Sequence, residues 1–106
     1  MKILFYDMGS YTCNDFLHYL KKAGHVCRTV YYHFPDKFND DFFCERFSSY
    51  LESDTYDAVI SINFFPLVAQ LCNNYNMKYI AWCYDSPLEI RLQEYFHYET
   101  NSIFLF

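Results

Sequence analysis

One stretch, residues 78–89 (KYIAWCYDSPLE), constrains the fold of this chain more than any other. Its apolar run, residues 79–84, is typical of a strand covered on both faces, as in a parallel sheet. Ser86 is a good helix N-cap, Pro87 suits the first helical position, and Glu89 completes the S-x-x-E capping box. The stretch therefore predicts a buried strand that runs directly into a capped helix.

The rest of the chain repeats this alternation. Short apolar runs predict strands, and apolar residues at helical spacing predict helices. The strands are expected at residues 2–6, 26–32, 57–62, 79–84 and 102–106, and the helices at 12–23 or 14–23, 40–53, 66–75 and 87–96. Such an alternation forms a parallel sheet with helices on both faces. The sequence predicts one Rossmann-like (flavodoxin-like) domain, a three-layer α/β/α fold over residues 1–106.

Several residues mark the ends of the expected helices. Thr12 or Asn14 is expected to cap the first helix, and Gly24 to end it. An acidic residue near Asp40 is expected to start the second helix, and Asn76 to leave the third in the left-handed conformation. The residues expected on the apolar helix faces are Cys13, Phe16, Leu17, Leu20, Ala23, Phe43, Phe47, Tyr50, Leu51, Leu67, Val68, Leu71, Cys72, Tyr75, Leu88, Leu92, and Tyr95 or Phe96.

Two strand orders suit this alternation, 2-1-3-4-5 and 3-2-1-4-5. The second strand carries Arg28 and Thr29, and these polar residues suit a sheet edge, so we expect 2-1-3-4-5. Ligands of open α/β sheets bind beyond the carboxyl ends of the strands. Asp7, Asn63 and Asp85 each follow a strand, and this order predicts that they converge on one crevice.

Composition excludes several classes of protein. Hydrophobic residues make up 53% of the 106 residues, which argues against disorder. The longest apolar run is far shorter than the ~18 residues of a membrane helix, and the first ten residues turn polar too early for a signal peptide. The net charge is −5 and the only basic pair is Lys21-Lys22, which argues against a nucleic-acid partner. We therefore expect a cytoplasmic protein without a membrane span.

Motifs for metals and cofactors are missing from the sequence. The five cysteines are scattered, without a C-x-x-C, and indicate reduced thiols rather than a metal site. The first strand-to-helix turn has one glycine, Gly9, and neither G-x-G-x-x-G nor a P-loop lysine occurs. A G-x-S-x-G elbow is also missing, which disfavours a hydrolase. We expect no metal, no cofactor, and no tight binding of NAD, FMN, ATP or nucleotide-sugars.

Five segments together resemble the N-terminal domain of glycosyltransferase-like proteins of the spore-maturation or family-1-like type. They are YDMGS, AGHV, SINFFP, YIAWCYDSP and IFLF, and they extend over nearly the whole chain. The resemblance implies a GT-B architecture, in which a second Rossmann-like domain follows. That second domain would bind the nucleotide-sugar donor, and the N-terminal domain would contribute the side that receives the acceptor, a glycan or another molecule.

The motif residues of that family fall on Asp7, Ser10, Asn63, Pro66, Tyr84, Asp85, Ser86 and Pro87. The resemblance gives motif membership and no roles, and Met8 replaces a tryptophan that is frequent in the family. Glycosyl transfer needs a base that takes the proton of the acceptor hydroxyl, and a carboxylate at the cleft can do this. We therefore expect Asp85 as the catalytic base. The residues expected to line the acceptor cleft are Asp7, Gly9, Ser10, Asn63, Tyr84 and Ser86.

Other interpretations of the same residues stay open. Ser86 and Pro87 are typical of a helix start, Asp85 suits the helix dipole, and Asn63 suits a turn. The alternative function is a non-catalytic flavodoxin-like module that binds a small ligand or a protein. GSYT at residues 9–12 only weakly matches the Ser/Thr-rich loop that holds the phosphate of FMN in flavodoxins. A receiver domain is disfavoured, because the first strand offers only one carboxylate.

The apolar segment at residues 102–106 ends the sequence in an expected strand. A natural domain rarely stops in such a strand, because its edge and outer face need cover. We therefore expect a fragment of a longer two-domain protein whose partner is its missing C-terminal domain. Alone, the fragment is expected to be inactive and to self-associate as a dimer, through this strand or through the surface that would face the missing domain.

Overall fold

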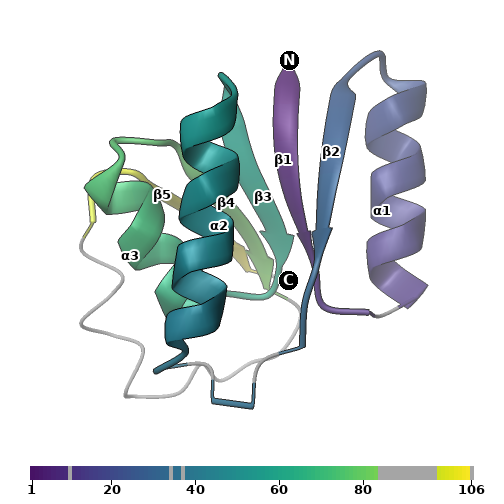
Figure 1. The fold of residues 1–106 in the computed structure, drawn as a ribbon. Coiled ribbons are helices and arrows are strands. Elements are labelled where there is room, and N and C mark those ends of the chain that lie inside the picture. The colour runs from purple at the N-terminus through teal and green to yellow at the C-terminus, as the bar shows by residue number, and fades with distance from the viewer. Residues whose placement is uncertain (10, 34, 37, 84–97, 106) are drawn as a thin grey trace.

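The computed structural model describes residues 1–9, 11–33, 35–36, 38–83 and 98–105 (Figure 1). Strands and helices alternate from the first strand to β4, and a fifth strand is described after it. They are β1 (Lys2–Asp7), α1 (Tyr11–Lys22), β2 (Val26–Tyr31), α2 (Asp41–Ser53), β3 (Ala58–Ile62), α3 (Pro66–Asn74), β4 (Tyr79–Cys83) and β5 (Asn101–Leu105). The helix expected at 87–96 lies outside the described residues.

All five strands form one parallel sheet in the order β2-β1-β3-β4-β5. Phe5 in β1 stands between Thr29 of β2 and Ile60 of β3. The predicted order 2-1-3-4-5 is confirmed, and 3-2-1-4-5 is excluded. Arg28 and Thr29 are exposed on the edge strand β2, as their polarity predicted.

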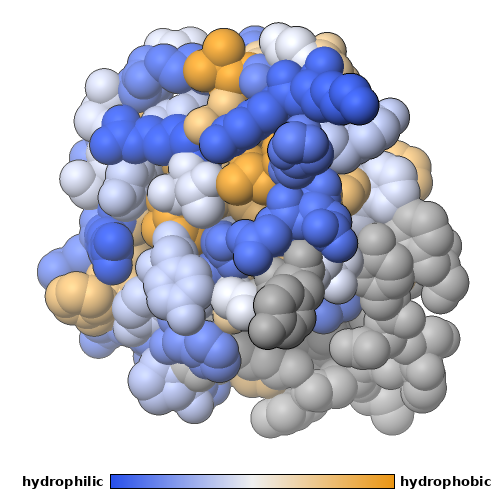
Figure 2. Space-filling model, turned by 90° about the vertical axis from the view of Figure 1, so that its right-hand side faces the viewer, coloured by the Kyte–Doolittle hydropathy of each residue, from blue (hydrophilic) through white to orange (hydrophobic). Residues whose placement is uncertain are grey.

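The described helices lie on both faces of the sheet, and each face has its own core. In Figure 1, α1 lies on one side, and α2 and α3 lie on the other. Ile3 and Phe5 pack with Cys13 of α1, whereas Leu4 and Tyr6 pack with Phe43 of α2. The run KILFY is therefore apolar at every position after its lysine, because alternate side chains of β1 enter opposite cores. The side that carries α1 is mostly hydrophilic, with separate hydrophobic patches (Figure 2).

Most of the expected helix ends are confirmed. The Oδ1 atom of Asp40 accepts a hydrogen bond from the backbone N–H of Phe43 at 3.0 Å and caps α2. Gly24 has φ 94° after α1, and Asn76 has φ 53° after α3. The expected cap at Thr12 or Asn14 is wrong, because α1 already begins at Tyr11 and both residues lie inside its first turns. The helix therefore starts sooner than the sequence pattern indicated.

Burial differs from expectation at a few positions. Strand β4 is fully buried on the face of Tyr79, Ala81 and Cys83, but Ile80 and Trp82 on the other face are only half-buried. Ala23 and Tyr75 are exposed because both follow the last helical residue. The remaining apolar helix residues named above are buried or half-buried where the structure describes them, Tyr50 being half-buried. Within the described ranges, no helix is long and apolar enough to cross a membrane.

Candidate functional site

The carboxyl ends of β1 and β3 form the centre of the candidate site. These strands are neighbours, with Tyr6 opposite Ser61, so Asp7 and Asn63 end their strands at the same edge of the sheet. The strand order reverses between β1 and β3, because β2 follows β1 on one side and β3 follows on the other. Such a reversal opens a crevice in which open α/β sheets bind ligands. The structure confirms that Asp7 and Asn63 share this edge.

The loop after β1 is held by a side chain of its own. The Oδ1 atom of Asp7 accepts a hydrogen bond from the N–H of Gly9 at 2.7 Å, and Gly9 has φ 94°. A Cβ atom at this position would lie 3.0 Å from Cε2 of the Tyr31 ring. The left-handed backbone favours glycine here, and a larger residue would also press on the Tyr31 ring. Tyr31 is 58% exposed and lies against this loop, and no sequence pattern assigned it to the site.

The loop after β3 depends on a buried chain of hydrogen bonds. Asn63 has φ 69°, which is uncommon for a residue other than glycine. The Ser61 hydroxyl donates to the Asn63 carbonyl at 2.7 Å and lies 2.5 Å from the Tyr79 hydroxyl. Since Ser61 has a single hydroxyl proton, Tyr79 is the donor to Ser61, and Tyr79 in turn accepts from the N–H of Phe65 at 3.2 Å. This chain fixes the turn at Asn63.

The environment of Tyr79 keeps its phenol neutral. Ser61 and Tyr79 are both fully buried, and burial raises the pKa of Tyr79, opposed by the hydrogen bonds to Ser61 and Phe65. A neutral phenol can act as donor and acceptor at once, which the chain of hydrogen bonds requires. The only sequence signal for this arrangement was a serine inside the apolar strand DAVISI.

A second chain of hydrogen bonds joins the same edge to α2. The Tyr6 hydroxyl donates to the Tyr32 carbonyl at 2.6 Å, and the Tyr32 hydroxyl donates to Oδ2 of Asp40 at 2.7 Å. The hydrogen bond to Asp40 raises the pKa of Tyr32, and burial raises the pKa of Tyr6. Asp40 also caps α2, so these tyrosines hold the connection between β2 and α2 near the crevice.

Several predicted site residues lie outside the described part of the chain. They are Ser10, Tyr84, Asp85 and Ser86, together with Pro87 of the motif. The described chain reaches the start of this segment at the end of β4. There the carbonyl of Trp82 accepts a hydrogen bond from the N–H of Asn63 at 2.6 Å. The expected base Asp85 follows Trp82 by three residues, and its role stays a prediction.

The described residues give no specific sign of a metal ligand set. They contain no group of three His, Cys, Asp or Glu side chains that could hold an ion. None of the five cysteines forms a disulfide in the described structure, and three of them are buried.

Comparisons with known proteins give no match: no family model matches this sequence, and no curated protein or solved structure is significantly similar to it.

Proposed function

We propose that the chain is the N-terminal, acceptor-side domain of a GT-B glycosyltransferase-like protein of the spore-maturation type, acting in the cytoplasm. One observation carries the proposal: the turns at Gly9 and Asn63 stand at the strand-order reversal, and both adopt left-handed backbone. Of the two, Asn63 is not glycine, and left-handed backbone at such a residue costs free energy and is found more often at functional sites. The crevice between these turns is where the acceptor binds.

The charge of the first loop supports a neutral ligand at this crevice. In a flavodoxin-like module, backbone N–H groups of that loop would hold the phosphate of FMN. Here the Asp7 carboxylate accepts the N–H of Gly9 and puts a negative charge at the same place. A phosphate would be repelled there, whereas the hydroxyl groups of a sugar can donate to a carboxylate. The exposed ring of Tyr31 adds an aromatic face against which the C–H surface of a sugar can pack.

In this proposal, Asp85 is the general base and Ser10, Tyr84 and Ser86 complete the cleft. Asp85 takes the proton of the acceptor hydroxyl as that hydroxyl attacks the donor sugar. The second domain holds the nucleotide-sugar, so the chain alone binds an acceptor without transferring a sugar to it. The free thiols of all five cysteines fit the reducing conditions of the cytoplasm.

Sugar binding at this crevice can be tested by NMR titration of the labelled protein with the methyl glycosides of glucose, galactose and N-acetylglucosamine. We expect at least one glycoside to shift the amide signals of Gly9, Tyr31 and Asn63 saturably. Tyr31→Ala should weaken the effect, because it removes the aromatic face. Tyr19→Ala on the exposed surface of α1 is the matched control.

FMN, ATP and a nucleotide-sugar such as UDP-glucose serve as comparison ligands. We expect none of them to bind at micromolar concentration. Micromolar FMN binding at the Gly9 loop would overturn the proposal and favour the small-ligand module. The proposal would also fail if none of the three glycosides moved the signals of the crevice.

A further inference from the structure

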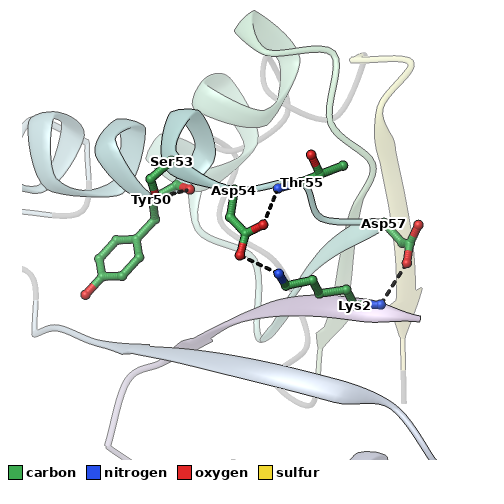
Figure 3. A network of polar contacts seen from close by, with 6 residues as sticks. All are labelled: Lys2, Tyr50, Ser53, Asp54, Thr55 and Asp57. Atoms are coloured by element: carbon green, nitrogen blue, oxygen red, sulfur yellow. Dashed lines mark hydrogen bonds and ion pairs between the residues drawn. The ribbon is translucent and has the colours of Figure 1, made fainter.

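A hollow lies away from the candidate site, between α2 and the edge strand β2. It is lined by Arg28, Arg46, Ser49, Tyr50 and Ser53 and has a volume of about 280 Å³. Arg28 lies within the edge strand β2, opposite Leu4 of β1, and Ser53 is the last residue of α2. Figure 3 shows Tyr50 and Ser53 beside Asp54, which follows the helix. We call this hollow the arginine pocket.

The spacing of residues in α2 builds one wall of the arginine pocket. Ser49, Tyr50 and Ser53 follow Arg46 by three, four and seven positions, so the four residues form one stripe along the helix. The apolar stripe of Phe43, Phe47 and Leu51 faces the core instead. Arg28 forms the opposite wall, because β2 has no strand beyond it at this edge.

Neither arginine forms an ion pair among the described residues, although Arg28 is close enough to Asp54 to contribute, after Lys2 and Thr55, to the lowered pKa of that carboxyl. The Arg28 guanidinium lies 4.7 Å from the centre of the Tyr50 ring, which orients it without neutralising it. The nearby carboxylate of Asp54 binds the ammonium group of Lys2 and the N–H of Thr55 (Figure 3). Two guanidinium groups therefore flank one hollow in a chain with a net charge of −5.

We propose that the arginine pocket binds the phosphate group of a small phosphomonoester. Guanidinium groups form paired hydrogen bonds with phosphate oxygens, and two of them match the dianionic charge of a phosphomonoester. The Ser49 hydroxyl adds a donor, whereas the Ser53 hydroxyl donates to the Tyr50 carbonyl at 3.2 Å and must rotate to contribute. The volume is at the lower end of ligand pockets, which fits a phosphate with a few attached atoms. The site is independent of the sugar crevice, so either proposal can fail alone.

The direct probe is a titration with inorganic phosphate at constant ionic strength, followed by NMR of the arginine side chains and backbone amides. We expect saturable shifts of the Arg28 and Arg46 Nε–H signals and of the amides of α2, with a Kd in the millimolar range. Glycerol 3-phosphate should shift the same signals, and glycerol should not. Lowering the pH to about 5.5 should weaken the binding of glycerol 3-phosphate, because a phosphomonoester loses its second charge near pH 6.

Arg46→Gln tests the assignment of the site. The substitution should weaken phosphate binding about tenfold, since it removes one charged hydrogen-bonding partner. Lys22→Gln removes an exposed charge from α1 and should leave the affinity unchanged. Ser49→Ala is a milder second variant, expected to weaken binding about threefold, and it keeps the test decisive if Arg46→Gln unfolds the protein. Shifts that stay linear with phosphate concentration, or that persist unchanged in both pocket variants, would overturn the proposal.

Discussion

At the scale of single residues, the most important side chain is Tyr79, whose position in an apolar run indicates no more than a core residue. Tyr79 opens β4 in an apolar run, and its ring is fully buried. Its hydroxyl, however, connects the N–H of Phe65 to Ser61, which holds the carbonyl of Asn63. A buried hydroxyl that makes two hydrogen bonds stabilises the fold through both of them. Its removal should also loosen the turn at Asn63, because Ser61 then loses one of its partners.

We expect Tyr79→Phe to lower the free energy of unfolding by about 1–3 kcal/mol, because it deletes two buried hydrogen bonds. Chemical denaturation with an unchanged m-value measures this loss. Tyr19→Phe on the exposed surface of α1 is the matched control and should change nothing measurable. If both substitutions had the same small effect, the chain from Phe65 to Asn63 would not stabilise the fold.

Tyr79→Phe should also change how the free energy of unfolding depends on pH. Because burial raises the pKa of Tyr79 in the folded state, the stability tied to its proton is complete below the unfolded pKa of about 10 and is lost as pH rises above it. Above pH 10, the unfolding free energy of the wild type should therefore fall more steeply than that of Tyr79→Phe. The difference should approach about 1.4 kcal/mol per pH unit, the value for one proton. Parallel curves would mean that Tyr79 does not titrate differently on folding.

At the scale of elements, the turn from β1 into α1 sets the shape of the candidate crevice. The turn combines the side chain of Asp7, the left-handed backbone of Gly9 and the ring of Tyr31 from the neighbouring strand. Gly24, at the other end of α1, has the same φ of 94°, but a Cβ atom added there would meet no other atom within 4 Å. Alanine substitutions at the two glycines can therefore be compared. Both pay for left-handed backbone, but only the one at Gly9 also meets the Tyr31 ring.

Gly24→Ala should destabilise the protein by about 1 kcal/mol, the cost of a left-handed alanine. Gly9→Ala should cost more, because its methyl group also meets the Tyr31 ring. In a Tyr31→Ala background, the cost of Gly9→Ala should drop to that of Gly24→Ala. Thermal or denaturant unfolding of the four variants checks this. Equal costs for the two alanine substitutions in the wild-type background would show that the ring moves away freely and does not shape the loop.

At the scale of the whole molecule, the two edges of the sheet differ in their protection. Edge strand β2 carries the exposed charge of Arg28, which discourages pairing with another chain. Strand β5 (NSIFL) has no charged residue, and Phe104 is 48% exposed and stacks on Trp82 at 5.3 Å between ring centres. Such an uncharged edge with an exposed aromatic face favours association.

We expect the protein to dimerise at high concentration through β5, and Phe104→Glu to prevent this, because a buried carboxylate at the contact is costly. Sedimentation over a concentration series measures the change. Tyr31→Glu places the same charge on the opposite edge strand and should leave the dimer intact. A protein that stays monomeric at high concentration, or a dimer that only Tyr31→Glu disrupts, would contradict the assignment to β5.

The sequence by itself determined the order of elements, the class of fold and the order of strands. Apolar runs and helical spacing depend on neighbours a few positions apart, so the sequence alone reveals them. The polar residues Arg28 and Thr29 likewise identify their strand as an edge strand. The placement of Asp7 and Asn63 at one edge follows from that order. The start of α1 was misjudged, because local capping preference pointed to Thr12 or Asn14, whereas the helix begins at Tyr11.

Only the tertiary structure decided which distant side chains meet. Ser61 and Tyr79 are 18 residues apart, and their hydroxyls meet because the register of β3 and β4 places them beneath one turn. Arg28 and Arg46 likewise share a pocket only because α2 crosses back over the sheet beside β2. Such contacts depend on register and on the packing of helices against the sheet, which are properties of the assembled fold and leave no periodic signal in the sequence.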